Sequence, residues 1–517
     1  GIADELAFAW WVNDMLRKRK RIVKKAKSRY WKRTHKYGVE LPKSVEEALA
    51  IDRNTQTDFW RKAIENEMKN VMPAFEFRDD DTPPIGDKHI RCHMVFDVKL
   101  VGLVRKARFV AGGHETDPPA ESTYSSVVSR DSVRLAFLIV ALNDLDILSA
   151  DVQNAYLNAP TKEKVYTTAG LEFGEANKGR PVIIVRALYG LKSSGARWRD
   201  HMAATLREGG FVNTRGDPDV WMRPAVKPNG FKYYEYVLCY VDDILAISHA
   251  PQSIMDYLSS KYTLKDGSVK PPDTYLGADI KEFKIPDADD PGKVRWAMSS
   301  ETYVKRVISD VERELDKAGK RLRAKVTTPI SQGDVTPELG DRQVTYYQGL
   351  IGVLRWICEL GRIDILVEVS MLSRFLACPR EGHLEETLHV FAYLKSHTRS
   401  TLVFDDTTPT FDQEFQAADW SEYYPGAKEA MPPNMPEPRG NAVTMTAFVD
   451  ADHAGDRATR RSHSGVLIFV NRAPILWFSK RQNTVETSTF GSEFIAMKQA
   501  VEMIEGLRYK IRMMGIE

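Results

Sequence analysis

Blocks of apolar and polar residues along the first half of the chain predict both helices and strands. Residues 44–72 place apolar side chains at helical spacing, and Ser44 followed by two glutamates is typical of a helix start. Residues 91–111 alternate with a period of two on both sides of Gly102, which predicts two paired strands. Residues 133–142 are almost entirely apolar and predict a buried helix.

The second half contains the same mixture of patterns. Helical spacing extends over residues 345–376 and 383–396, and a further helix is predicted from Thr489 to the end of the sequence. Residues 444–478 contain two strand-like runs. Five prolines in residues 425–440 predict a linker ahead of this last segment.

Two adjacent carboxylates lie between two short apolar runs in residues 234–248, a pattern that predicts a strand, a tight turn carrying Asp242 and Asp243, and a second strand. An isolated Asp-Asp pair is more often an exposed turn. Beside buried strands, however, two charges are costly unless a cation neutralises them, and Mg²⁺ prefers such hard oxygen ligands. Two ions roughly 3.5–4 Å apart need a third carboxylate. Asp151, which follows a strand-like segment and precedes Tyr156 by five positions, is the candidate.

Composition narrows the class of protein. The 517 residues are 43% hydrophobic and 28% charged, which is typical of a folded chain rather than a disordered one. The longest uncharged apolar run, residues 135–142, is far below the ~20 residues of a membrane span. Four cysteines without a CxxC pair predict neither a disulfide framework nor a zinc site, and favour a reducing compartment. Because the sequence starts at Gly1, we expect a fragment of a longer protein.

The net charge of the chain is only +2, but one segment of it is strongly basic. Residues 17–36 hold twelve Lys and Arg and no acid, which leaves about −10 for the rest of the chain. Such a tract indicates contact with nucleic acid or a nuclear import signal, and a solvated arm between domains is an equally good interpretation.

Seven sequence blocks in order resemble one family. The chain is similar, over roughly residues 50–517, to the reverse transcriptase and partial ribonuclease H region of a copia-type LTR-retrotransposon Pol polyprotein. The blocks that carry the resemblance are RKARFVAGG (105–113), DVQNAYLNAP (151–160), ALYGLKSSGARW (187–198), YVDD (240–243), YLGADI (275–280), GRIDILVEVSMLSRFLACP (361–379) and FVDADHAGDRATRRSHSGVLIF (448–469).

This resemblance implies an α+β fold, namely a right-hand polymerase with fingers, palm and thumb/connection, followed by an incomplete ribonuclease H-like α/β domain. The expected boundaries are a basic N-terminal arm at 1–45, fingers and palm at 46–285, thumb/connection at 286–400, a Pro-rich linker at 401–440 and the truncated ribonuclease H-like domain at 441–517.

The resemblance also assigns the polymerase site. It implies two Mg²⁺ (or Mn²⁺) ions and gives the catalytic and metal-binding roles to Asp151, Asp242, Asp243 and, for the metal, the carbonyl of Val152. Tyr240 and Val241 would contact the primer end.

The implied nucleotide-binding residues are spread over three blocks. Tyr156 matches the aromatic gate that excludes a 2′-hydroxyl, and Lys106 and Arg108 would hold the triphosphate. Gly190 and Lys192 match the block that lines the template and nucleotide pocket, although the family commonly has Gln and then Pro after Leu191 where this chain reads KSSG. Each has a structural alternative, because a basic strand face is often merely solvated and an aromatic residue often belongs to a core.

In the last domain the resemblance matches Asp450 and Glu493 with the first two metal ligands of ribonuclease H. Without the strand aspartate, Glu493 would be read as an acid favoured by the helix dipole. The family's next ligand lies on a later strand, beyond this sequence. Glu502 and Glu505 would lie roughly 14–18 Å along the same helix as Glu493. We therefore expect ribonuclease H activity to be absent from this fragment.

The expected function is that of an RNA-directed DNA polymerase of a retrotransposon, acting on an RNA template, a DNA or RNA primer and deoxynucleoside triphosphates, with no membrane. The implied location is cytoplasmic, in a virus-like particle, and the basic tract is also compatible with entry into the nucleus. The sequence does not specify the oligomeric state. One alternative is a decayed or domesticated fragment that only binds nucleic acid. A carboxylate hydrolase such as a glycosidase is another, but it does not explain the block at 105–113.

Overall fold

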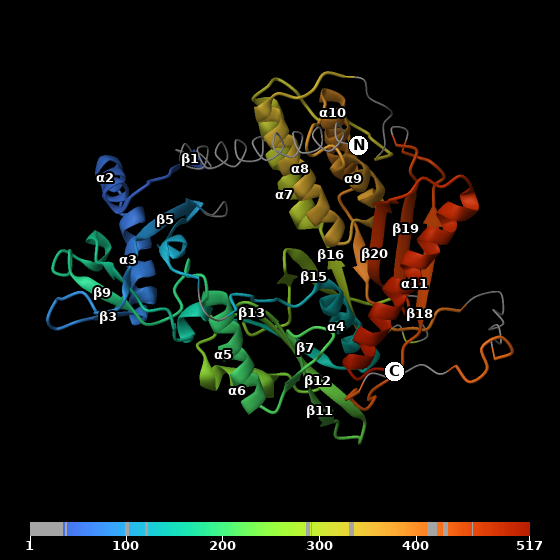
Figure 1. The fold of residues 1–517 in the computed structure, drawn as a ribbon, viewed down its shortest axis with the longest axis horizontal. Coiled ribbons are helices and arrows are strands. Elements are labelled where there is room, and N and C mark those ends of the chain that lie inside the picture. Colours follow the sequence, from blue (N-terminus) through green and yellow to red (C-terminus); the bar gives the residue numbers. More distant parts are fainter. Residues whose placement is uncertain are drawn as a thin grey trace, which may run out of the picture. The chain divides into compact units, whose positions relative to one another are not determined.

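The computed structural model describes residues 35–36, 39–98, 103–118, 122–285, 290, 292–329, 336–410, 421–427, 433–456 and 459–517 (Figure 1). The chain divides into two compact units. The first comprises Gly1–Ser125 and Asn154–Ala204, and the second comprises Ser126–Gln153 and Thr205–Glu517. Residues 17–34 of the basic tract lie outside the described residues, so its predicted roles stay predictions. Among the helices that the structure describes, none is both long and apolar enough to cross a bilayer.

Residues 44–72 of the first unit form two helices where the sequence predicted one helical block. Ser44 caps α2 (Val45–Thr55), because its hydroxyl accepts a hydrogen bond from a first-turn amide at 3.2 Å. The carboxylate of Asp52 then accepts the amide of Arg61 at 2.8 Å, near the start of α3 (Phe59–Val71). An acceptor is available at the start of each helix, so the chain breaks into two helices without losing backbone hydrogen bonds.

The strands of the first unit surround an aromatic core. The predicted pair in residues 91–111 is confirmed as the antiparallel hairpin β5 (Cys92–Val98) and β6 (Arg105–Ala111). Phe75, Phe109 and Phe173 meet edge to face with ring centres 5.1–5.7 Å apart. The other strands are β1 (His35–Lys36) paired with β2 (Val39–Glu40), and a sheet in the order β3 (Phe75–Phe77), β9 (Pro181–Ile184), β8 (Val165–Thr168) and β4 (Lys88–His89).

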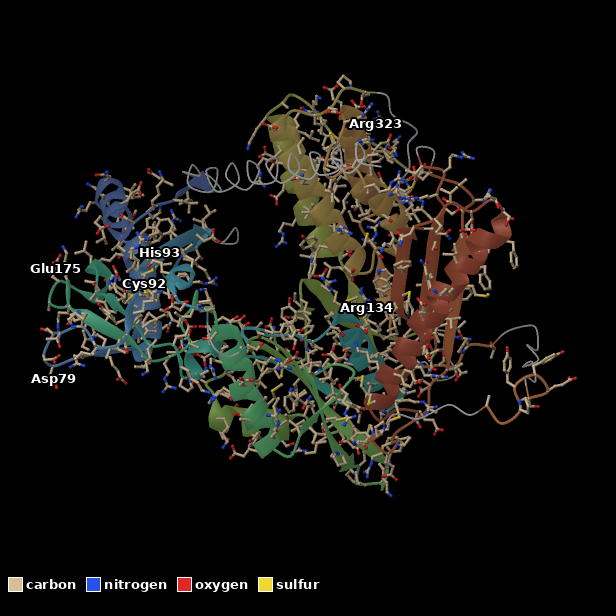
Figure 2. The ribbon with its side chains drawn as sticks, in the orientation of Figure 1. Asp79, Cys92, His93, Arg134, Glu175 and Arg323 are labelled. Atoms are coloured by element: carbon tan, nitrogen blue, oxygen red, sulfur yellow. The ribbon has the colours of Figure 1, made fainter. Side chains whose placement is uncertain are left out.

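Cys92 and His93 lie at the start of β5 within this unit (Figure 2). Burial raises the pKa of the Cys92 thiol to about 12, so it is a neutral thiol at ordinary pH. Burial also lowers the pKa of His93. Both shifts favour uncharged, structural side chains over a reactive pair.

An antiparallel five-stranded sheet forms the base of the second unit. The predicted buried helix is confirmed as α4 (Arg130–Leu142), in which every residue from Ser132 onward is buried. Helix α6 (Gln252–Lys261) contacts the edge strand β7. The sheet has the order β10 (Val212–Asn213), β11 (Val220–Val226), β12 (Lys232–Tyr240), β13 (Asp243–Ser248) and β7 (Asp146–Asp151).

A second sheet and four helices follow in the chain. The expected helix over 345–376 is two helices, α8 (Asp341–Glu359) and α9 (Leu366–Ser373). Between them Gly361 has a φ of 107°, and a side chain there would collide with Leu402 at 2.7 Å. The sheet order is β14 (Thr274–Tyr275), β15 (Ala278–Phe283), β16 (Arg295–Ser299) and β17 (Thr401–Val403), and the other two of these helices are α7 (Glu301–Asp316) and α10 (Glu381–Ser396). Helix α5 (Ser194–Glu208) comes earlier in the chain and begins in the first unit. Strand β17 lies inside the range expected to be linker.

The last part of the second unit is a three-stranded antiparallel sheet with one long helix. The two predicted strands are confirmed as β18 (Met445–Ala451) and β19 (His463–Val470), and a third, β20 (Ala473–Arg481), was not predicted. Helix α11 (Thr489–Met513) follows Ser488, whose hydroxyl accepts the Gly491 amide at 3.2 Å. It packs against β18 and β19 (Figure 1).

The end of α11 is bonded to the five-stranded sheet and its helix α4. The hydroxyl of Tyr236, on β12, donates to the carbonyl of Met514 at 2.7 Å, and both residues are buried. The ammonium of Lys510 lies 2.5 Å from Asp131 and 3.8 Å from the buried Asp217, and it donates to the Ser129 hydroxyl at 2.7 Å. The C-terminal helix is therefore part of the same core as β12.

Arg134 makes a second link between these parts. Its side chain, on α4, is buried and lies 3.7 Å above the ring centre of Trp477 (Figure 2). It donates to the carbonyl of Ile475 at 2.9 Å and to that of Glu359 at 2.7 Å. One guanidinium thus joins α4 to β20 and to the end of α8.

Candidate active site

The turn between β12 and β13 carries the two adjacent aspartates, as the sequence predicted. Tyr240 pairs with Asp243, so Val241 and Asp242 form a two-residue loop. Val241 has a φ of 59°, a left-handed conformation that suits glycine in such loops and that a β-branched side chain rarely adopts. Strain of this kind costs about 1–3 kcal/mol and is typical of functional sites.

Asp151 ends the neighbouring strand, β7. In the pairing of β13 with β7, Asp151 lies directly opposite Asp243. The amide of Val152 then donates to the carbonyl of Asp242 at 2.9 Å. Two backbone contacts therefore bring three carboxylates, which are up to 92 positions apart in the sequence, to one end of the five-stranded sheet.

The electrostatics of this sheet end favour a cation. The pKa of Asp243 is raised to about 6, mainly by burial and also by the charges of Asp242 and Asp151, while Lys265 opposes the rise. One oxygen of Asp151, Oδ1, is buried and has no hydrogen-bond partner among the described residues. A free buried oxygen and three mutually repelling carboxylates fit a hard divalent cation such as Mg²⁺.

The three carboxylates do not converge on a common point in this structure. In the part of the chain that the structure describes, no three His, Cys, Asp or Glu side chains converge closely enough to form a metal-binding group. The other oxygen of Asp151, Oδ2, forms an ion pair with the ammonium of Lys265. A metal ion at this end of the sheet would therefore require side-chain rotation and would compete with an ammonium group.

Lys265 is the residue at this site that sequence reasoning missed. Its amide donates to the carbonyl of Asp151 at 2.9 Å, and the preceding residue, Leu264, forms a β-bridge with Val152. The segment after α6 thus runs along the free edge of β7. A single lysine in a polar loop carries no signal in the sequence, since its role depends entirely on this edge pairing.

The candidate nucleotide ligands are in the first unit. Lys106 and Arg108 are both exposed and lie on the same face of β6, opposite Asp97 and Val95 of β5. The guanidinium of Arg108 lies 4.9 Å from the centre of the Tyr189 ring. The alternation of basic residues on a strand is confirmed, and their role in binding phosphate stays a prediction.

The block at 187–192 packs against the end of β6. Gly190 has a φ of 97°, and a Cβ there would lie 2.1 Å from the carbonyl oxygen of Ala111. Glycine is therefore required by this packing alone, without any bound nucleotide. The ammonium of Lys192 donates to the carbonyl of Thr116 at 2.5 Å. Tyr156 lies in the short 3₁₀ turn η4 (Ala155–Asn158) of the same unit.

The candidate ribonuclease H ligands lie on elements that pack together. Asp450 is exposed on β18, where it pairs with Gly465 of β19. Glu493 is exposed near the start of α11, the helix that contacts β18. The strand and the helix are arranged as predicted, and the role of the two acids stays a prediction.

Comparison with known proteins agrees with the sequence motifs. Residues 79–318 match the family described as reverse transcriptase (RNA-dependent DNA polymerase). The chain is 26% identical over 491 residues to a retrovirus-related Pol polyprotein from transposon TNT 1-94 of Nicotiana tabacum, an alignment that covers 92% of this chain and 33% of that protein. It is 25% identical over 466 residues to the corresponding polyprotein from transposon RE1 of Arabidopsis thaliana, covering 88% and 28%.

A transposon Ty1-BL Gag-Pol polyprotein of Saccharomyces cerevisiae is 24% identical over 484 residues, covering 90% of this chain and 25% of that protein. The chain thus spans about a quarter to a third of the length of these relatives. A structure of the foamy viral protease-reverse transcriptase in complex with double-stranded DNA aligns over 87% of this chain and 60% of that one, at 11% identity. Its TM-score of 0.24 is too low to support an argument about the fold. Residues 79–318 therefore resemble a reverse transcriptase domain, and the chain is similar, over most of its length, to the Pol polyproteins of copia- and Ty1-type retrotransposons.

Proposed function

We propose that this chain is an RNA-directed DNA polymerase that adds deoxynucleotides to a primer 3′-hydroxyl. The observation that carries the proposal is the strand register that places Asp151 opposite Asp243, beside Asp242, within a matched reverse transcriptase domain. Three carboxylates at a sheet end, with one lysine ammonium beside them, are suited to phosphoryl transfer assisted by two metal ions.

Under this proposal the residues take the roles that the family resemblance implies. Asp151, Asp242, Asp243 and the carbonyl of Val152 would hold two Mg²⁺ or Mn²⁺ ions. When bound, such ions lower the pKa of an attacking hydroxyl and neutralise the charge of a leaving pyrophosphate. The strained turn at Val241 fixes the backbone positions from which Asp242 and Asp243 project, because a loop of two residues between paired strands has little freedom.

The first unit supplies the nucleotide-binding side chains under this proposal. Lys106, Arg108 and Lys192 carry positive charge that suits a triphosphate, and Tyr156 is the aromatic gate against a 2′-hydroxyl. Tyr240 and Val241 would lie against the primer end. The first unit then acts as fingers, and the five-stranded sheet acts as palm.

The last domain completes the proposed layout. Residues 286–400 would serve as thumb and connection, and residues 441–517 as a ribonuclease H-like domain that holds Asp450 and Glu493. Template and primer would be gripped mainly through phosphates, so binding should weaken steeply with salt. We propose that this chain alone does not cut the RNA strand of a hybrid.

Primer extension on an RNA template tests the proposed function. The purified 517-residue chain should extend a DNA primer with deoxynucleotides in the presence of Mg²⁺ or Mn²⁺, and should not do so in EDTA. Asp242→Asn should reduce extension at least a thousandfold, because it removes one ligand charge and leaves the shape unchanged. Asp256→Asn, an exposed carboxylate on α6, is the matched control and should extend normally.

Binding of the template–primer, measured by fluorescence anisotropy, separates the alternatives. A wild-type chain that binds the duplex but never extends it, with either metal, would support a decayed fragment that only binds nucleic acid. An Asp242→Asn variant that extends as fast as wild type would show that this turn is not the catalytic site.

A further inference from the structure

Three side chains from separate segments of the first unit lie in contact with one another in a row. The guanidinium carbon of Arg108, on β6, lies 4.9 Å from the centre of the Tyr189 ring. The centre of the same ring lies 4.9 Å from that of Tyr156, with the two ring planes 58° apart. Both distances are within the range of favourable cation–π and aromatic contacts. Tyr189 therefore contacts the proposed sugar gate and one proposed triphosphate ligand at the same time.

The backbone holds Tyr189 firmly in place. Its carbonyl accepts the amide of Ala111 at 2.7 Å. The next residue, Gly190, leaves no room for a side chain against the Ala111 carbonyl, and a Cβ on Gly113 would lie 2.0 Å from the carbonyl oxygen of Gly190. The turn is thus packed backbone to backbone on the end of β6, three positions beyond Arg108, so the ring of Tyr189 starts from a fixed Cα.

Tyr156, in contrast, lies on a short turn rather than on a strand or a long helix. It is in the four-residue 3₁₀ turn η4 (Ala155–Asn158), which is entered through Asn154 at a φ of 51°. In this turn the amide of Leu157 donates to the carbonyl of Asn154 at 2.8 Å, and the amide of Ala159 donates to that of Tyr156 at 3.0 Å. Short 3₁₀ turns have poorer hydrogen-bond geometry than α-helices, so the direction of the Tyr156 ring depends on the side chains packed against it.

We propose that Tyr189 is a positioning residue for sugar selection, which holds the ring of Tyr156 at the angle that excludes a 2′-hydroxyl. Arg108 supports the ring of Tyr189 through its guanidinium and acts in selection through that ring. This inference rests on the proposed function, because it assigns a partner to the proposed gate. Selection by exclusion requires a rigid ring, since a tilt that moves the ring edge by about 1 Å makes room for one oxygen atom.

The ratio of kcat/KM for a deoxynucleotide to that for the matching ribonucleotide measures the effect. Tyr189→Leu should lower this ratio about tenfold, mainly by improving use of the ribonucleotide, because the gate ring loses its support. Tyr189→Phe keeps the ring and should retain the wild-type ratio. Arg108→Met should lower the ratio in the same direction by a smaller factor. If Tyr189→Leu does not fold, Arg108→Met decides, and an unchanged ratio there overturns the proposal.

A double substitution separates selection from simple packing. In a Tyr156→Val background the gate is gone, so adding Tyr189→Leu should not change the ratio further. A Tyr189→Leu variant that loses thermal stability and kcat/KM for both sugars equally, with an unchanged ratio, shows ordinary core packing and overturns the inference. A wild-type chain that extends no primer refutes the proposed function instead, and a normal ratio in Tyr156→Val refutes the gate on which this inference depends.

Discussion

Replacing Asp243 with asparagine should make the metal-free protein more stable, although it removes a proposed catalytic group. The pKa of Asp243 is raised from 3.8 to about 6 by burial and by the charges of Asp242 and Asp151. A raised folded-state pKa means that the contribution of this group to stability is fully present below pH ~4 and is lost as the pH rises through about 6. The ionised carboxylate therefore destabilises the folded state at neutral pH.

The magnitude follows from the shift. A difference of about two pKa units corresponds to ~3 kcal/mol, and solvent access to this half-buried carboxylate reduces the effect to ~1–1.5 kcal/mol. In a unit of this size such a change raises the melting temperature by about 1–3 °C. Because asparagine cannot ionise, the advantage of Asp243→Asn should be largest near pH 8 and should shrink as the pH falls to 5.

Thermal unfolding in EDTA, at pH 8 and at pH 5, measures this effect, with Asp256→Asn as a control for the loss of one surface charge. Adding Mg²⁺ should then raise the melting temperature of the wild type more than that of the variant, because a ligand that binds only the folded state stabilises it by mass action. A variant that melts at or below the wild-type temperature at pH 8 in EDTA would refute the reasoning.

Three further substitutions test other parts of the structure. Gly190→Ala should lower the free energy of unfolding of the first unit by about 2–4 kcal/mol, measured by urea denaturation, because the new side chain would clash with Ala111. Gly174→Ala, where φ is a similar 86° but no atom lies within reach of a Cβ, should lower it by about 1 kcal/mol. Equal costs would contradict this packing. Lys265→Met should tighten Mg²⁺ binding three- to tenfold in calorimetry, since an ammonium no longer competes for the carboxylate beside it, and weaker binding would argue against competition. Lys510→Met should leave the carboxylates of Asp131 and Asp217 without their cation and lower the free energy of unfolding by about 2–4 kcal/mol. The loss should appear as faster hydrogen exchange in α11, and unchanged exchange would show that this ion pair does not hold the helix.

Local patterns made part of the site predictable. The hairpin that carries Asp242 and Asp243 is visible because two apolar runs flank two charges over only fifteen residues. The position of Asp151 opposite Asp243 was predicted only through the family motif, since no local pattern specifies pairing between strands that far apart in the chain. Lys265 and Tyr189 were missed for the same reason, because their roles come from contacts with distant backbone and rings.

The errors in the fold have comparable causes. The break between α8 and α9 depends on the left-handed backbone of Gly361 and on Leu402, which arrives from a distant strand. Strand β20 begins near Pro474 and has a nearly continuous apolar run, so the alternation that reveals a half-buried strand is absent. The motif that joins Asp151 to Tyr156 reads as one block, yet its two residues belong to different units.

The hydrogen bond between Tyr236 and Met514 constrains the order in which parts of this protein can fold during synthesis. The hydroxyl of Tyr236 is buried in the finished fold, and its acceptor lies 278 residues later in the chain. At a ribosomal rate of about 5–20 residues per second, that acceptor is synthesised roughly 15–55 s after the tyrosine. During this interval the strand that leads to the aspartate turn lacks part of its cover. We therefore expect nascent chains to recruit chaperones over this sheet, and the aspartate turn to reach its final structure only after α11 has left the ribosome.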